Sequence, residues 1–265
     1  MAISLKDLRK AKADQPPRVL VHGGPGMGKT TLASCFPNPV FLQTEEGNLK
    51  NTEIDTFGLL ADYQSIMDAI GALYTEDHGY QTVVLDSLDK AEPLVWAATC
   101  AANRWESIES PGFGKGYLAA DPFWRELLDG LFALRRDRGM IVVLIGHSEI
   151  IRFDDPSTVS YSRYDIRLHK RALAMVQDEA DAILFINQDV TIQTEEQGFN
   201  KKRSRGEGGH QRWIYTEGRP AFVAKNRFDM PPKILFDRAH AFDELAKHFP
   251  GMDAPASVSP SEAAA

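Results

Sequence analysis

Short apolar runs recur along the chain, and polar or glycine-rich segments separate them. The runs are RVLVH (18–22), VFLQT (40–44), TVVLD (82–86), MIVVLIG (140–146) and AILFI (182–186). Uninterrupted aliphatic and β-branched runs of this length are typical of parallel strands covered on both faces. The pattern therefore predicts a buried, mostly parallel sheet.

Segments with helical periodicity lie between these runs, most clearly at residues 122–137. The apolar residues of this segment repeat at the spacing of one helix face and are Trp124, Leu127, Leu128, Leu131 and Leu134. We expect Asp121 to cap the helix and Pro122 to be its first residue. Strands that alternate with helices predict an α/β fold whose ligand binds beyond the carboxyl ends of the strands.

The pattern changes after residue 188, where two strand-like segments flank a glycine-rich basic turn. This order predicts an antiparallel hairpin, followed by a further strand at AFVAKN. The turn carries the compact basic cluster Lys201, Lys202, Arg203 and Arg205. The cluster fits a solvated hairpin tip as well as a phosphate contact.

The ends of the chain differ from its middle. Residues 4–12 have the pattern of a short amphipathic helix, and the last residues, GMDAPASVSPSEAAA, have the composition of a flexible tail. We therefore expect an N-terminal helix and linker at residues 1–16, one core at 17–249 and a flexible tail at 250–265.

Composition and charge narrow the function. The chain has 265 residues, of which 43% are hydrophobic and 25% charged, as in an ordinary globular protein. A net charge of −7 argues against a surface that coats duplex DNA nonspecifically. Cys35 and Cys100 lie too far apart in sequence to suggest a zinc motif. No signal-like or membrane-spanning apolar run is present, so we expect a cytoplasmic protein that does not associate with membranes.

The most specific motif joins the first strand to a helical segment. It matches GxxxxGK[ST] and comprises Gly23, Gly24, Pro25, Gly26, Met27, Gly28, Lys29 and Thr30, with Thr31 directly after it. In a P-loop the glycines let backbone N–H groups surround phosphates, and the lysine reaches the β and γ phosphates. We therefore expect these residues to bind ATP.

The candidates for binding Mg²⁺ and activating water are Thr30 and two acidic residues. Thr30 and Asp86, at the end of TVVLD, are the expected Mg²⁺ ligands, because a P-loop site needs an acid at the end of a neighbouring strand. Asp89 is expected to be a helix cap. Asp86 is followed by Ser and not by Glu, so Glu45 is the candidate general base, provided that its strand neighbours the P-loop strand.

Further polar residues are candidates for sensing and stabilising the γ-phosphate. His147 ends the strand MIVVLIG, where a side chain can sense this phosphate, with Ser148 as the substitute. Lys225 and Arg227 can reach a nucleotide bound by the next subunit and act there as fingers. Structural roles remain open for all of them: a satisfied histidine for His147, and solvated edge-strand charges for Lys225 and Arg227.

The order of these motifs resembles the RecA-like ATPases, and within them the phage nucleotide-binding proteins related to Sak-type single-strand annealing proteins. The resemblance covers most of residues 17–235 and is carried by HGGPGMGKTTLA, FLQTEEG, VVLDSLD, GFGKGY, VVLIGHSEI, LHKRALAMVQDEADAILF and AKNRFDMP. It implies a RecA-like P-loop NTPase core, with a mostly parallel sheet flanked by helices and a C-terminal antiparallel hairpin extension.

The resemblance also implies a function. Such a protein binds ATP and Mg²⁺, hydrolyses ATP, binds single-stranded DNA, anneals complementary strands and works as a homo-oligomer beside a single-strand-binding protein in the host cytoplasm. Glu45 would be its catalytic glutamate, whereas His147 stands where recombinases usually carry glutamine. DNA would contact loops at 107–118 and 149–164, whose candidate residues are Phe113, Lys115, Tyr117, Arg152, Arg163 and Tyr164.

Other functions share the P-loop. A small-molecule or nucleotide kinase should close an Arg-rich lid over its acceptor, but the obvious basic segment here is a glycine-rich hairpin. A GTPase needs an NKxD motif, and neither NQD (187–189) nor KNRFD (225–229) has that spacing. A DNA-binding module that binds ATP without hydrolysing it remains a third possibility.

Overall fold

The computed structural model describes residues 15–47, 53–196 and 202–252, and the side chains of residues 190–210 are not among the described features. The expected helix at 4–12, nearly all of the expected tail and Lys201 lie outside these ranges, as do the side chains of Lys202, Arg203 and Arg205. No helix among the described residues is long and apolar enough to cross a membrane.

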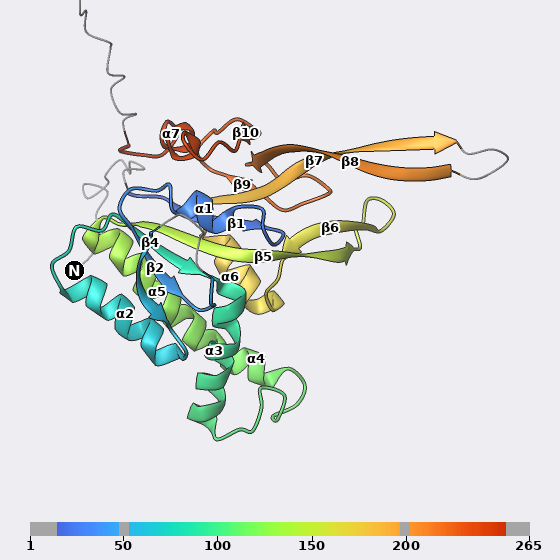
Figure 1. The fold of residues 1–265 in the computed structure, drawn as a ribbon. Coiled ribbons are helices and arrows are strands. Elements are labelled where there is room, and N and C mark those ends of the chain that lie inside the picture. The colour runs from blue at the N-terminus through green and yellow to red at the C-terminus, as the bar shows by residue number, and fades with distance from the viewer. Residues whose placement is uncertain (1–14, 48–52, 197–201, 253–265) are drawn as a thin grey trace, which may run out of the picture.

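Strands and helices alternate along most of the chain (Figure 1). The strands are β1 (Arg18–Gly23), β2 (Pro39–Gln43), β3 (Asp55–Leu59), β4 (Thr82–Asp86), β5 (Ile141–Phe153), β6 (Tyr161–Ile166), β7 (Ala182–Glu196), β8 (Lys202–Tyr215), β9 (Lys225–Asn226) and β10 (Lys233–Leu235). The helices are α1 (Lys29–Ala33), α2 (Tyr63–Thr75), α3 (Leu88–Asn103), α4 (Lys115–Ala119), α5 (Asp121–Arg138), α6 (Lys170–Glu179) and α7 (Ala241–Ala246).

The main sheet has the order β10-β8-β7-β1-β5-β4-β2-β3. The pairs β1–β5, β1–β7, β4–β5, β2–β4 and β2–β3 are parallel. Strand β8 is antiparallel to both β7 and β10, and β9 is antiparallel to the start of β7. The expected α/β fold, with a mostly parallel sheet flanked by helices and a C-terminal antiparallel extension, is therefore confirmed.

The sheet is covered on both faces, which explains its apolar strands. Alternate residues of β1 point to opposite faces, so Leu20 packs with α2, α3, α5 and α6, whereas Val19 and Val21 pack with α1 and α7. The apolar stripe predicted for α5 is buried in the first of these two clusters. This double burial holds the carboxyl ends of the central strands at one edge of the sheet.

The start of α5 differs from the prediction. Helix α5 begins at Asp121, its N-cap residue is Ala120, and no side chain caps it. Because α4 ends one residue earlier, the chain is already helical there and Ala120 has helical backbone angles. The carboxylate of Asp121 instead accepts hydrogen bonds from Arg171 Nε at 2.9 and 3.1 Å. The prediction of Asp121 as a cap is wrong for this reason.

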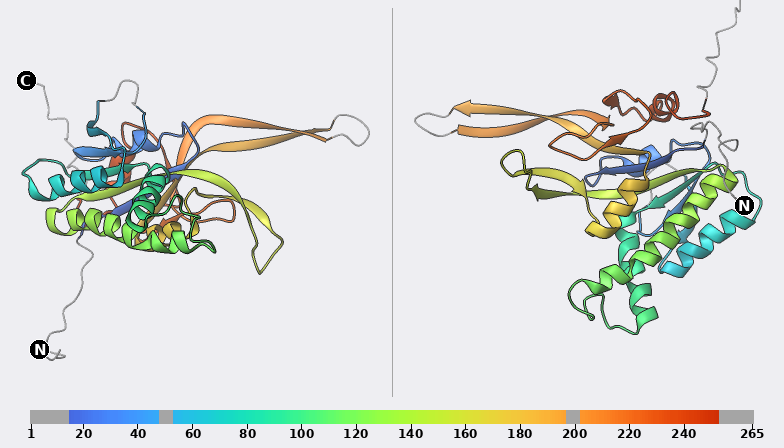
Figure 2. Two further views of the ribbon diagram at one scale, coloured as in Figure 1. Left: turned by 90° about the horizontal axis from the view of Figure 1, so that it is seen from below. Right: turned by 180° about the vertical axis from the view of Figure 1, so that it is seen from behind.

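Two antiparallel ribbons extend from the core on the same side (Figures 1 and 2). One consists of β5 and β6, which pair from Ser148–Ile166 to Phe153–Tyr161, and the other is the distal part of β7 and β8. The segment 149–164, expected to be a loop, is therefore mostly a hairpin. It was missed because its strand residues are largely polar and flank the turn DDPSTVS.

Candidate functional site

The P-loop connects β1 to α1 at the carboxyl edge of the sheet, where sequence predicted it. Two of its glycines are required by close contacts. A Cβ atom on Gly23 would lie 2.6 Å from the backbone oxygen of Ile186, and one on Gly28 would lie 2.6 Å from the Phe236 ring. Gly28 also has a φ of 101°, which L side chains rarely adopt. The loop is thus packed between β7 and the segment after β10.

Lys29 is buried and folds back on this loop. Its Nζ atom donates hydrogen bonds to the backbone oxygens of Gly23, at 3.2 Å, and Gly24, at 3.1 Å. Burial lowers the pKa of Lys29, and the negative charges of Asp86, Asp89 and Glu45 oppose that effect. The lysine therefore faces an acidic environment in which a phosphate group can compete for its ammonium.

Thr30 and Asp86 lie together, as predicted. The Thr30 hydroxyl donates a hydrogen bond of 2.8 Å to Asp86 Oδ2. Strand β4 is not next to β1, because β5 lies between them, so the expectation of a neighbouring strand is corrected. Two oxygen ligands suit Mg²⁺ in a P-loop, where phosphate oxygens and water complete the octahedron. Among the described residues, no group of three or more His, Cys, Asp or Glu side chains could hold a metal ion.

Glu45 follows β2, which pairs with β3 and β4 and not with the P-loop strand. The assumption of direct neighbourhood was therefore wrong. Glu45 is nevertheless within electrostatic range of the site. Burial raises the pKa of Asp86 and the charge of Glu45 adds to that effect, whereas at Lys29 the same charge opposes the lowering of the pKa by burial. The preceding residue anchors Glu45 to the end of β4. Thr44 N donates to the backbone oxygen of Asp86 at 2.8 Å, and the Thr44 hydroxyl donates to the backbone oxygen of Ser87 at 2.8 Å.

His147 also lies at this edge, paired in register with Gly23. Its Nδ1 and backbone N atoms contact Asp89 Oδ1 at 2.9 and 3.1 Å. Asp89 also accepts a hydrogen bond of 2.5 Å from Arg167. Asp89 is therefore not a helix cap as predicted: Ser87 is the N-cap residue of α3, and the Asp89 carboxylate points to two other segments.

Neither Arg167 nor His22 was predicted from the sequence to lie at this site. Ser148 lies beside His22, which is fully buried, and its Oγ atom is 2.9 Å from His22 Nδ1. His22 Nε2 lies 2.8 Å from the Val223 oxygen. Since a carbonyl only accepts, Nε2 is the donor and Nδ1 accepts from Ser148. Burial lowers the pKa of His22 to about 4. Ser148 is thus held by the neighbouring strand.

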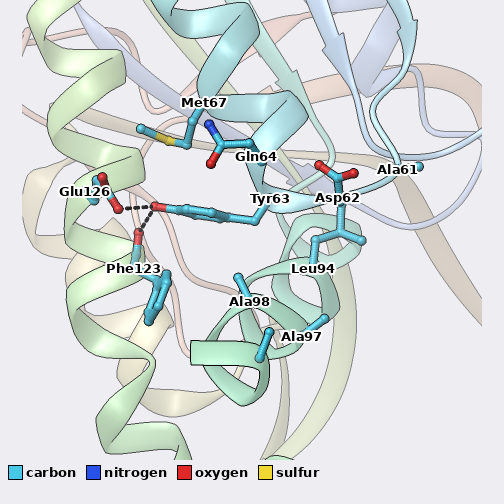
Figure 3. Close-up of a pocket in the computed structure, with 11 residues that line it drawn as sticks. Ala61, Asp62, Tyr63, Gln64, Met67, Leu94, Ala97, Ala98, Phe123 and Glu126 are labelled. Carbon is cyan, nitrogen blue, oxygen red and sulfur yellow. Dashed lines mark hydrogen bonds between the residues drawn. The ribbon is translucent and has the colours of Figure 1, made fainter. Parts of the chain in front are cut away.

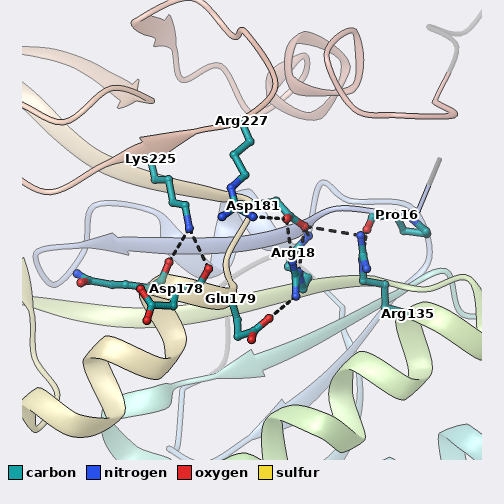
Figure 4. A network of polar contacts seen from close by, with 9 residues as sticks. Pro16, Arg18, Arg135, Asp178, Glu179, Asp181, Lys225 and Arg227 are labelled. Atoms are coloured by element: carbon teal, nitrogen blue, oxygen red, sulfur yellow. Dashed lines mark hydrogen bonds and ion pairs between the residues drawn. The ribbon is translucent and has the colours of Figure 1, made fainter. Parts of the chain in front are cut away.

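Lys225 and Arg227 lie at the opposite edge of the sheet (Figure 4). They flank Asn226, which pairs with Ala182 at the amino end of β7. Lys225 Nζ donates to the backbone oxygens of Gln177 and Asp178 at 2.8 and 3.1 Å, and Arg227 lies 3.4 Å from Asp181. They are therefore outside the P-loop site of their own chain.

Comparison with known proteins identifies the family of this chain. Residues 15–228 match the family model AAA_24, which is described as an AAA domain. The chain belongs to this AAA domain family. No curated protein matches it. The solved structures similar to this AAA domain include the RadB recombinase, with 16% identity, a TM-score of 0.46 and coverage of 83% of this chain and 86% of the other. They also include the flagellar accessory protein FlaH from Methanocaldococcus jannaschii, with 10% identity, a TM-score of 0.40 and coverage of 84% and 86%.

A groove of about 470 Å³ begins at Thr31, directly beyond the P-loop of the AAA domain. Its walls come from β8 and the segment after β10, and the lining residues are Thr31, Gln211, Arg212, Leu235, Phe236, Asp237 and Arg238. A second groove, of about 550 Å³, lies between α2, α3 and α5 (Figure 3). There Tyr63 donates hydrogen bonds to the Phe123 oxygen and to Glu126. No P-loop residue lines this second groove.

The candidate DNA-contacting residues divide into two groups. Phe113, Lys115 and Arg152 have exposed side chains. The other three are held by protein neighbours: Tyr117 stacks on His169 with ring centres 4.0 Å apart, Arg163 pairs with Asp165 at 2.7 Å, and Tyr164 packs on Phe185. Arg152 nevertheless contacts its own hairpin, since its Nη2 atom donates to Ser160 Oγ at 3.1 Å and its Nε atom lies 3.5 Å from Asp154. Exposure leaves the three side chains of the first group accessible to a ligand.

Proposed function

We propose that this AAA domain binds and hydrolyses ATP, binds single-stranded DNA and promotes annealing of complementary strands, as in Sak-type phage proteins. The observation that carries the enzymatic part is the convergence of Lys29, the Thr30–Asp86 pair and Glu45 at one edge of the sheet. We propose further that the protein acts as a homo-oligomer beside a single-strand-binding protein in the cytoplasm.

The residues would divide the chemistry among them. The loop from Gly23 to Gly28 and Lys29 bind the phosphates of ATP, while Thr30 and Asp86 hold Mg²⁺, which neutralises charge on the β and γ phosphates. Glu45 orients the attacking water and accepts its proton. The groove that begins at Thr31 is the proposed site of the nucleoside, and its lining includes Arg212 and Phe236.

The proposed DNA site lies on the two ribbons. Strand β1 ends at Gly23, which pairs with His147 of β5 and Ile186 of β7, and both of these strands continue past that point. The ribbons therefore begin beside the P-loop, so a change at the nucleotide has a short path to them. Arg152 lies on one ribbon, and β8 of the other ribbon includes Lys202, Arg203 and Arg205 of the basic sequence cluster.

The nucleotide part is tested with a fluorescent ATP analogue. Lys29→Ala should abolish binding, whereas Lys247→Ala, which removes an exposed lysine paired with Glu244, should leave it unchanged. Glu45→Gln should retain binding and slow hydrolysis by about 10²-fold or more. Normal affinity in Lys29→Ala would refute the P-loop assignment, and unchanged turnover in Glu45→Gln would refute the role of Glu45.

The DNA part is tested by fluorescence anisotropy of a labelled single-stranded oligonucleotide, with and without ATP and Mg²⁺, at two salt concentrations. Tight binding that weakens with salt is expected, because cations that contact phosphates release counterions. If the protein binds ATP but no oligonucleotide under any condition, the recombination function is wrong. In that case a screen of phosphate acceptors would test the kinase alternative.

A further inference from the structure

Three polar side chains from different segments meet beside the P-loop. Asp89, on the first turn of α3, has a side chain that is 4% exposed. Its Oδ1 accepts hydrogen bonds from His147, and its Oδ2 accepts one from Arg167. A backbone hydrogen bond also joins two members of the cluster, since Arg167 N donates to the backbone oxygen of His147 at 2.8 Å. A buried carboxylate thus fixes one histidine and one arginine.

The register of the sheet places this cluster beside the first glycine of the P-loop. His147 pairs with Gly23, whose backbone oxygen accepts the Lys29 ammonium. The charge of Arg167 acts on Lys29, and that of Glu45 acts on Arg167. Arg167 is therefore within electrostatic range of both the P-loop lysine and the candidate base.

Arg167 keeps most of its hydrogen-bonding capacity. The bond to Asp89 uses one nitrogen of a guanidinium that has five donors, and half of the side-chain surface is exposed. By contrast, Lys225 and Arg227 of the same chain lie at the far edge of the sheet. Arg167 is thus a cation that each chain can supply to its own nucleotide.

We propose that Arg167 is a catalytic residue that binds the γ-phosphoryl oxygens of ATP held by the same chain, and that Asp89 and His147 are its positioning residues. This inference rests on the proposed ATP hydrolysis. As the water oxygen bonds to Pγ, its proton passes to Glu45 and the bond from Pγ to the bridging oxygen breaks. The electron pair stays on the β-phosphate, and Lys29 and Arg167 stabilise the charge on the phosphate oxygens.

The test compares Arg167→Ala and Arg167→Lys with Arg171→Ala. Arg171 is a matched control, because its side chain is 41% exposed and, like Arg167, pairs with one carboxylate, that of Asp121 on α5. Affinities for ATP and ADP and single-turnover hydrolysis are measured for each variant, and circular dichroism and thermal melting verify folding. If Arg167→Ala does not fold, the same measurements on Arg167→Lys test the inference.

Arg167→Ala should lower the hydrolysis rate by about 10²-fold or more, as for other transition-state donors. It should also reduce the preference for ATP over ADP, with ADP affinity unchanged. Arg167→Lys should restore part of both, because it supplies charge without the bidentate geometry. Wild-type hydrolysis and wild-type discrimination between ATP and ADP in Arg167→Ala would overturn the inference.

The controls separate this inference from the proposed function. If Lys29→Ala loses both nucleotides while Arg167→Ala resembles Arg171→Ala, only the role of Arg167 is wrong. If Lys29→Ala retains both nucleotides, the P-loop assignment itself fails. Should the wild-type protein bind ATP without turnover, the ratio of ATP to ADP affinity in Arg167→Ala still decides whether Arg167 contacts the γ-phosphate.

Discussion

Two buried carboxylates on α3, those of Glu92 and Asp89, have pKa values shifted in opposite directions. Glu92, on α3 and 7% exposed, accepts hydrogen bonds from the backbone N of His169 at 3.0 and 3.2 Å. Burial raises its pKa to about 7, and that hydrogen bond opposes the effect. At Asp89 burial also favours protonation, but the hydrogen bonds from His147 and Arg167 outweigh it and lower the pKa. Ion partners thus decide which of the two carboxylates stays charged.

The raised pKa of Glu92 predicts a pH-dependent stability. Between pH 4.5 and 7 the folded protein holds a proton that the unfolded chain has released, so stability falls as the pH rises through this window. Glu92→Gln removes this dependence and keeps an acceptor for His169. We therefore expect the free energy of unfolding of the variant, relative to that of wild type, to rise by on the order of 2 kcal/mol from pH 5 to pH 8. Urea unfolding at the two pH values measures it.

Comparing the free energies of unfolding of wild type and Glu92→Gln at each pH isolates the contribution of Glu92. His22, whose pKa is lowered to about 4, has the opposite effect, but it is present in both proteins. The exposed Glu217 provides the matched control, because Glu217→Gln removes one carboxylate without changing a buried site. An equal stability difference at both pH values for Glu92→Gln would contradict the prediction.

At the scale of elements, β5 and β7 have two roles. Their first residues are buried between β1 and the neighbouring strands, and their later residues leave the core as ribbons. The core and the ribbons therefore depend on different interactions: the core on burial between two helical layers, and the ribbons on cross-strand pairs. The ribbon of β7 and β8 should be removable without loss of the core.

Shortening this ribbon tests both statements. Replacing residues 191–207 by Asn-Gly would join the paired residues Val190 and Gly208 through a two-residue turn. We expect the melting temperature and the ATP affinity to remain close to wild type and the affinity for single-stranded DNA to fall. Loss of ATP binding would show that the ribbon supports the core.

A second variant separates charge from length. Changing Lys201, Lys202, Arg203 and Arg205 to Gln keeps the hairpin length and removes four cations. If these side chains contact phosphates, the slope of log affinity against log salt should decrease in magnitude by up to about 3. An unchanged slope would assign DNA binding to other residues.

At the scale of the whole molecule, the candidate cations occupy two edges of the sheet. Arg167 lies at the P-loop edge, and Lys225 and Arg227 lie at the amino end of β7. A cation at the P-loop edge can act within one chain, whereas one at the far edge can act only on a nucleotide of another chain. The two proposals therefore differ in their dependence on assembly.

Mixing variant subunits distinguishes them. Subunits with Lys225→Ala and Arg227→Ala, mixed with Lys29→Ala subunits, should recover some hydrolysis, because intact P-loops then meet intact fingers. Arg167→Ala subunits mixed with Lys29→Ala subunits should not recover, since a neighbour cannot supply Arg167. Absence of rescue in the first mixture would count against the trans fingers, and rescue in the second would contradict a role within one chain.

Local features were predicted from the sequence because they depend on short-range constraints. The parallel strands and the stripe of α5 follow from periodic burial, and the P-loop follows from glycines that adopt left-handed angles or leave room for neighbouring atoms. The pairing of Thr30 with Asp86 was also predicted, because parallel strands bring their carboxyl ends to one edge.

The order of the strands and the partners of polar side chains were decided only by tertiary structure. Sequence periodicity does not show that β5 separates β1 from β4 or that β2 lies beyond β4, since any buried parallel strand has the same pattern. Asp89 and Asp121 have the sequence context of helix caps, but arginines distant in sequence bind their carboxylates instead. By itself, the sequence determined which chemical groups are present and which strands are buried. The long-range packing of the sheet decided which of those groups meet, including Arg167 beside the P-loop, because contacts between distant segments depend on topology and leave no local pattern.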